Sequence, residues 1–122
     1  MQASKIDIQQ LQGIWKMTNI EGPTKDLADM YTQGMPILQI NVNQKTISGF
    51  SGCNSYNSIF SHDDKKIYFN QPFSLTKKHC RGGGEAVYLE TLKKVDNFVV
   101  VNNELKLKMG SVVVMTFELE LE

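Results

Sequence analysis

Two cysteines, Cys53 and Cys80, are the side chains of this sequence best suited to covalent chemistry. An even pair of cysteines in a small domain favours a disulfide in an oxidising compartment. Closing a loop of this length would stabilise the fold by about 3.5 kcal/mol in the chain-entropy model. The alternative is two buried free thiols that act as small hydrophobic side chains. A redox-active pair is disfavoured, because the sequence has no Cys-x-x-Cys motif.

A catalytic nucleophile finds little support in the sequence. His79 directly precedes Cys80, but neighbours in an extended segment point to opposite faces, so His79 would not activate that thiol. His62 lies in a turn of charged residues and is expected to be solvated. Ser51 and Ser55 are not part of a Gly-x-Ser-x-Gly elbow. We therefore expect a protein that is not an enzyme and has no catalytic residue.

Two segments that resemble ligand sites are explained better by turn chemistry. His62-Asp63-Asp64 offers oxygen ligands, but adjacent carboxylates without the spaced calcium-loop pattern form a poor cage. The three glycines at 82–84 precede a predicted helix, as in phosphate-binding loops. No Walker motif is present, and Glu85 would repel an anion there while complementing the helix dipole. We expect no metal and no cofactor.

Length and charge limit the class of protein. With 122 residues the chain is expected to form a single domain over residues 1–122. Its 13 basic and 13 acidic residues cancel, so no overall field recruits nucleic acid or an anionic membrane. No apolar run approaches the roughly 20 residues of a membrane-spanning helix. Basic residues gather locally and are expected to form a solvated rim, which could also meet an acidic protein surface or phospholipid headgroups: Lys65, Lys66, Lys77, Lys78, His79 and Arg81.

The residues at the two ends of the sequence are of the kind that cloning into an expression vector adds. Met1 precedes a polar segment, as if a start codon had been placed before a mature domain. Leu121-Glu122 repeats the preceding Leu-Glu pair and is typical of a cloning scar.

Alternation of apolar and polar residues predicts a mainly β protein. About eight short strands are expected from nine extended segments, which are residues 14–20, 36–42, 46–51, 55–61, 66–70, 73–76, 98–101, 105–109 and 112–119. Helical spacing of Leu89, Leu92 and Val95 predicts one principal helix over residues 85–95. We expect a small antiparallel cracked β-barrel with this helix plugging or flanking it. Trp15 shares the inward face of the first strand with Met17 and should be buried.

Three motifs follow one another along the chain. They are Ser48-Gly-Phe-Ser-Gly-Cys-Asn-Ser-Tyr-Asn57, then Ser74-Leu-Thr-Lys-Lys-His-Cys80, then Glu85-x-x-Tyr-Leu-Glu-x-Leu92. In this order they resemble the META domain, the family that includes the heat-shock-associated HslJ proteins of bacteria. The resemblance implies a structural role for its matching positions, namely Trp15, Gly49, Gly52, Cys53, Asn54, Tyr56, Thr76, Cys80, Glu85, Leu89 and Leu92.

The glycines and the Asn of the first motif also have a physical interpretation. Gly49 and Gly52 would supply a positive φ or a close approach of the backbone. Asn54 can adopt the left-handed region or hydrogen-bond nearby backbone. The chain departs from the family pattern at Ser58, where members often have glycine, and at residues 77–79, where Lys-Lys-His makes the rim more basic.

The resemblance implies a non-enzymatic interaction domain of the bacterial cell envelope, in the periplasm, at the outer membrane or on the cell surface. It implies links to stress tolerance, drug resistance or secretion, and a likeness to secretin pilot proteins. The expected partner is a protein, a peptide or a lipid, with no nucleic acid, and the domain is expected to be monomeric. Many members carry a secretion or lipoprotein signal, so a lipidated cysteine upstream of Gln2 would anchor this domain.

The alternative function is protease inhibition. A small barrel can display stiff loops, and a preorganised loop loses little entropy on binding. The candidate loops are residues 21–35 and the turns around Cys53 and Cys80.

Overall fold

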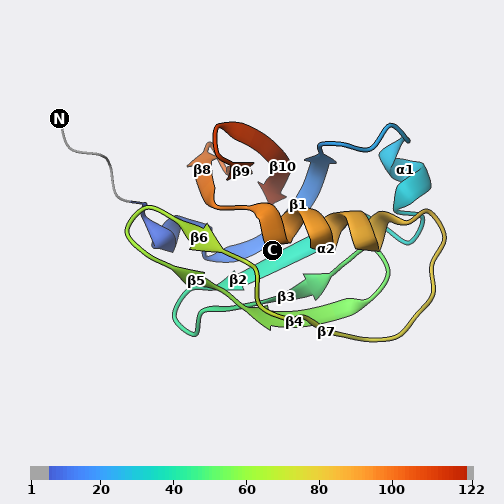
Figure 1. The fold of residues 1–122 in the computed structure, drawn as a ribbon, viewed down its shortest axis with the longest axis horizontal. Helices are drawn as coiled ribbons and strands as arrows, with labels where there is room; N and C mark the ends of the chain where they lie inside the picture. The colour runs from blue at the N-terminus through green and yellow to red at the C-terminus, as the bar shows by residue number, and fades with distance from the viewer. Residues whose placement is uncertain (1–5, 121–122) are drawn as a thin grey trace.

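The alternating apolar residues form one strongly bent antiparallel sheet in the computed structural model, which describes residues 6–120 (Figure 1). The elements in chain order are η1 (Ile8–Leu11), β1 (Gly13–Ile20), α1 (Leu27–Met30), β2 (Ile37–Asn41), β3 (Thr46–Phe50), β4 (Ser55–Ile59), β5 (Ser61–His62), β6 (Ile67–Tyr68), β7 (Ser74–Leu75), α2 (Gly84–Lys94), β8 (Asn97–Val101), β9 (Glu104–Met109) and β10 (Val112–Leu119). The expectations for Met1 and Leu121-Glu122 lie outside the described residues.

Eight of these strands form the main sheet, in the order β7-β4-β3-β2-β1-β10-β9-β8. The mainly β, antiparallel class is thus confirmed, with ten strands instead of about eight, because β5 and β6 pair separately. The sheet is not closed, since β7 and β8 remain its two edges. Figure 1 shows α2 between the two halves of the bent sheet, with β8–β10 on one side and β2–β4 on the other. The helix therefore covers apolar surface that strand pairing would cover in a closed barrel.

The core lies between the sheet and α2. Trp15 is 2% exposed, and its indole Nε1 donates a hydrogen bond to Leu11 O at 2.9 Å, so the predicted burial is confirmed. Leu38 and Ile40 of β2 are fully buried, as their alternation with polar residues predicts. Leu92 on α2 is also fully buried, and Leu89 is nearly so.

Most predicted elements differ from the structure by one or two residues at their ends, as where the strand expected over 66–70 is β6. The strand expected over residues 55–61 is interrupted at Phe60, whose ring is buried and whose N–H donates to Lys45 O at 3.0 Å. This bond extends the register of β3 and β4 by one residue, and beyond it the chain leaves the main sheet and continues as β5. The principal helix begins one residue earlier than predicted, at Gly84, and ends at Lys94. Val95 follows the helix and is buried beyond its end.

None of the helices within residues 6–120 has the length and apolar character needed to cross a membrane.

Candidate functional site

The corner after β3 is joined to the loop after β7 by a disulfide between Cys53 and Cys80. Their Cα atoms lie 5.8 Å apart, and Cys53 is 5% exposed. Of the two alternatives left open by the sequence, the structure has the disulfide and not the free thiols. The bond occupies both sulfurs, so neither cysteine is available as a nucleophile in this state. Cys53 Sγ approaches Lys78 O to 3.6 Å, which is a contact only, because a disulfide sulfur has no hydrogen to donate.

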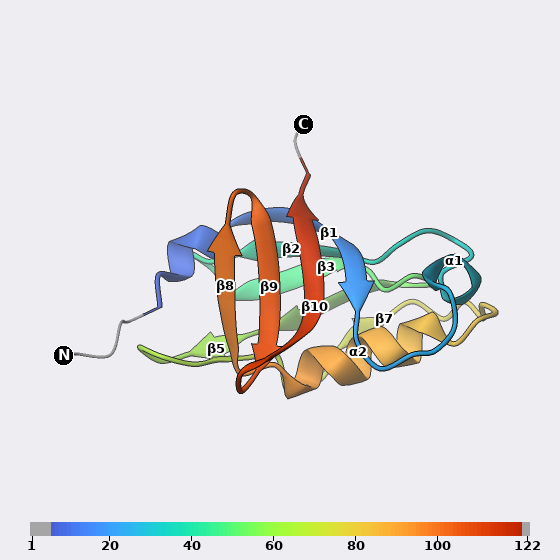
Figure 2. The ribbon, with the colours of Figure 1, turned by 90° about the horizontal axis from the view of Figure 1, so that it is seen from above.

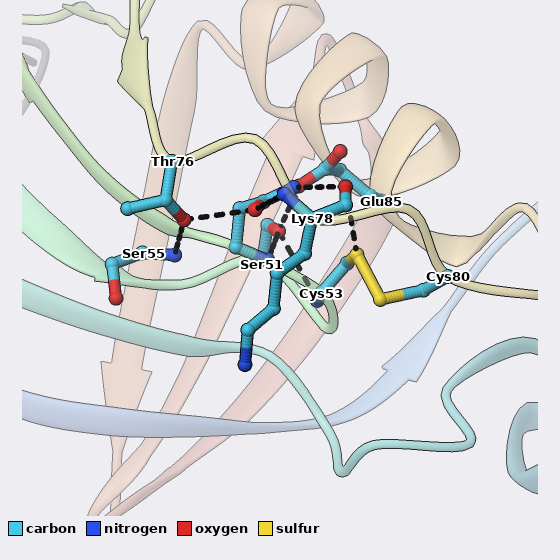
Figure 3. The surroundings of a disulfide bond; sticks show 8 residues. Ser51, Cys53, Ser55, Thr76, Lys78, Cys80 and Glu85 are labelled. Atoms are coloured by element: carbon cyan, nitrogen blue, oxygen red, sulfur yellow. Dashed lines mark hydrogen bonds between the residues drawn. A yellow bond between two sulfur atoms is a disulfide. The ribbon is translucent and has the colours of Figure 1, made fainter.

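Asn54 holds the loop after β7 with every hydrogen-bonding position of its amide. Its Oδ1 accepts from Thr76 Oγ1 at 2.8 Å and from Lys78 N at 2.6 Å. Its Nδ2 donates to Lys78 O at 3.1 Å and to Glu85 Oε2 at 2.9 Å. Asn54 is 3% exposed, and a buried amide with four partners fixes the groups around it. Figure 3 shows this network, with the Lys78 side chain extending away from it.

Ser51 completes the connection between the corner and α2. Its Oγ donates to Glu85 Oε2 and accepts from the backbone N–H groups of Cys53 and Asn54. Glu85 lies in the first turn of α2, where a carboxylate complements the helix dipole as expected. It also receives the Ser51 and Asn54 bonds, so the same carboxylate ties the helix to the corner. No local pattern predicts this role of Ser51, because its partner is 34 residues away.

The glycines of the first motif allow close approach of the backbone. A Cβ on Gly49 would lie 2.1 Å from Ile37 O, and its φ is +147°. A Cβ on Gly52 would lie 2.4 Å from the ring of Tyr31, and its φ is +96°. Both interpretations offered by the sequence, positive φ and close approach, therefore apply at these positions.

Three tyrosines lie beneath the corner. The hydroxyl oxygens of Tyr56 and Tyr88 are 2.6 Å apart, and Tyr56 Oη donates to Ile37 O at 2.8 Å. Burial raises the pKa of both hydroxyls well above the usual tyrosine value, and it raises the pKa of Tyr31 to about 12. These hydroxyls therefore stay protonated near neutral pH and serve as core contacts. Tyr56 and Tyr88 belong to the first and third motifs, but sequence reasoning did not predict the burial of Tyr88 or Tyr31.

The histidines do not form a catalytic pair with the cysteines. His62 Nδ1 lies 3.1 Å from Asp63 O, and its Nε2 lies 3.4 Å from Lys45 Nζ, so its contacts are local to its turn. The Asp63 carboxylate accepts from the N–H groups of Lys65 and Lys66, and these two bonds lower the pKa of Asp63. Hydrogen bonds within the turn therefore explain the presence of His62 and Asp63 there. Within residues 6–120, no group of three or more His, Cys, Asp or Glu is placed to hold a metal ion.

The six basic residues separate into two groups. Lys65 and Lys66 belong to the turn between β5 and β6, at the opposite end of the molecule from the loop that joins β7 to α2 (Figure 1). Lys66 forms an ion pair with Asp96 at 3.4 Å. The other group is exposed, and in the described part of the chain its side chains form no ion pair: Lys77, Lys78, His79 and Arg81. Only four of the six residues therefore lie together, and the basic surface is the loop at residues 76–81, named here the tethered loop.

A family model for the META domain matches residues 8–120. The chain belongs to the META domain family. Several solved structures share the META fold seen here. A protein from Burkholderia xenovorans, solved by NMR, is 23% identical with a TM-score of 0.71, covering 100% of this chain and 96% of its own. A DUF4847 family protein from Bacteroides vulgatus, solved by crystallography, is 13% identical with a TM-score of 0.61, covering 88% of this chain and 92% of its own.

These likenesses concern the fold of the META domain. A search of curated proteins found no match. The function is therefore argued from the tethered loop and its supports.

Proposed function

We propose that this META domain is a non-enzymatic interaction domain of the bacterial cell envelope, and that the tethered loop is its binding surface. The observation that carries the proposal is the way this loop is held. Asn54 and the disulfide fix its backbone, while the side chains of Lys77, Lys78 and His79 are exposed. A loop fixed before binding loses little conformational entropy when a partner arrives.

The disulfide supports the envelope assignment. Disulfides persist in the periplasm and at the cell surface and are rare where thiols are kept reduced. The family resemblance supports a role in stress or secretion and a lipid anchor upstream of the domain. The unpaired cations of the loop support a partner that presents carboxylates, and we propose that the domain meets it as a monomer.

The absence of catalysis is part of the proposal. Both cysteines are bonded to each other, and His79 has no hydrogen-bond partner in the described part of the chain. Nucleophilic catalysis needs a nucleophile within hydrogen-bond reach of a base. Purified protein should therefore hydrolyse no ester, peptide or phosphate substrate at a rate that a single His or Ser substitution abolishes.

Photo-crosslinking in intact cells tests the binding surface. A photoreactive amino acid at position 79 should give a discrete crosslinked product in the envelope fraction. The same amino acid at position 44, in the turn between β2 and β3, serves as the matched control and should give none. Alkylation before non-reducing electrophoresis should show no reactive thiol. A cytoplasmic protein with two alkylated cysteines, or equal crosslinking from both positions, would refute the proposal.

A further inference from the structure

We propose that the tethered loop is a substrate-like inhibitor of trypsin-class serine proteases, and that Lys77 enters the primary specificity pocket of the protease. The inference rests on the proposed function only in that both use this loop as the binding surface. It adds the class of the partner, the residue that is recognised and the reason why the loop is not simply digested.

The backbone of the loop presents the groups that a protease binds. Thr76 N donates to Ser55 O at 3.1 Å, and Lys78 N donates to Asn54 Oδ1 at 2.6 Å. Successive peptide groups of an extended chain point in opposite directions, so the backbone groups of Leu75 and Lys77 face outward. Leu75 is the last residue of β7, which is an edge of the sheet, and Lys77 lies two residues beyond it. A partner can add to such an edge as an antiparallel strand.

The side chain of Lys77 suits the specificity pocket of a trypsin-class protease. That pocket ends in a carboxylate and selects a long cationic side chain. Lys77 is exposed and has no hydrogen bond or ion pair in the described part of the chain. Lys78 is equally exposed, but its own N–H and C=O are both bound to Asn54. The backbone of Lys78 therefore cannot pair with a protease, and the geometry selects Lys77.

Asn54 and the disulfide explain how the loop resists digestion. Hydrolysis after Lys77 would add water across the Lys77–Lys78 bond, leaving a carboxylate on Lys77 and an amine on Lys78. Asn54 would still hold Lys78 through its carbonyl, and Thr76 would hold the other end. The new ends therefore stay in place to rejoin, as in an intramolecular reaction.

The disulfide also keeps the cleaved protein in one piece. Cys53 lies before the Lys77–Lys78 bond and Cys80 lies after it, so both fragments remain covalently linked. Figures 1 and 2 show the segment between β7 and α2 running along the outside of the molecule, where a protease cleft can reach it.

Titration of trypsin with the oxidised full chain tests the inference, using a small chromogenic lysine substrate. We expect stoichiometric inhibition of trypsin and none of chymotrypsin. Lys77→Ala should weaken inhibition by about 30-fold or more, the size of an interface hot spot. Lys65→Ala is the matched control, with the same charge lost at an exposed position in the turn between β5 and β6, and should change it by less than about 3-fold. Lys77→Phe should transfer inhibition to chymotrypsin. All three substitutions are at exposed positions, so folding should be preserved.

The other outcomes overturn the inference. They are an absence of inhibition, complete digestion of the loop, or a Lys65→Ala effect as large as that of Lys77→Ala. Mass spectrometry after long incubation and reduction should find only partial cleavage, confined to the Lys77–Lys78 bond. If trypsin is not inhibited but position 79 still crosslinks in cells, the inhibitor inference fails and the proposed function survives. If the natural protein is cytoplasmic and reduced, the proposed function fails, while the titration of the oxidised protein stands on its own.

Discussion

Asn54→Ala should remove the centre of the network that ties the tethered loop to the corner and to α2. Four hydrogen bonds are lost, three to neutral groups and one to the Glu85 carboxylate. Neutral bonds contribute about 1 kcal/mol each and a bond to a charged group about 1.5–3 kcal/mol, for a sum of about 5 kcal/mol. Water can replace part of this at Lys78, which is exposed, so we expect a loss of about 3 kcal/mol in the free energy of unfolding.

Asn54→Asp is the matched variant because it keeps the shape and both acceptor bonds. It loses the two donor bonds and places a carboxylate where Nδ2 now lies, 2.9 Å from Glu85 Oε2. At neutral pH it should be at least as destabilising as Asn54→Ala, and acidification should recover part of the loss as one of the two carboxyls takes a proton. Urea denaturation at constant m-value measures both variants. A loss below about 1 kcal/mol for Asn54→Ala, or an Asp variant as stable as the wild type, would refute the reasoning.

Three further changes test other parts of the fold. Trp15→Ala should cost about 3–5 kcal/mol in urea denaturation, because the side chain is 2% exposed; a cost below about 1 kcal/mol would contradict this burial. Reduction of the Cys53–Cys80 bond should lower stability by about 3.5 kcal/mol, seen as a lower Tm, and an unchanged Tm would contradict it. Bonds from Asn97 and Gly110 lower the pKa of Asp96, so its contribution is present above its unfolded pKa of about 3.9 and is lost as the pH falls through its folded pKa. Asp96→Asn should therefore reduce the acid-induced loss of stability, measured by urea titration at successive pH values; an unchanged pH dependence would argue against it.

Local pattern was sufficient for most of the fold. The alternation in β2 and β10 and the helical spacing in α2 depend on which face is apolar, and this can be read from the sequence. Closure of the sheet cannot be read in this way, because it depends on whether β7 and β8 come within hydrogen-bonding distance. The departure of the chain from the main sheet at Phe60 was missed for a similar reason, since the pairing of β5 with β6 belongs to the tertiary structure.

The candidate site was predicted in its parts but not in its connections. Spacing and residue type identified Cys53, Cys80 and Asn54 as special positions. Neither could show that Asn54 bridges Lys78 and Glu85, which lie 24 and 31 residues further along the chain. Tyr88 was missed because a helical stripe of Leu and Val already explained α2, and the polar hydroxyl concealed its burial.

The position of β1 has a consequence for biosynthesis. This strand, near the start of the chain, pairs with β2 on one side and with β10, the final strand, on the other. Because β10 is the last strand of the domain, the sheet cannot be completed until every strand before it has been synthesised. Such long-range pairing folds slowly. The sheet of a nascent chain therefore stays incomplete until β10 has been synthesised, and a truncation that removes β10 would leave β1 paired only with β2 and β9 paired only with β8.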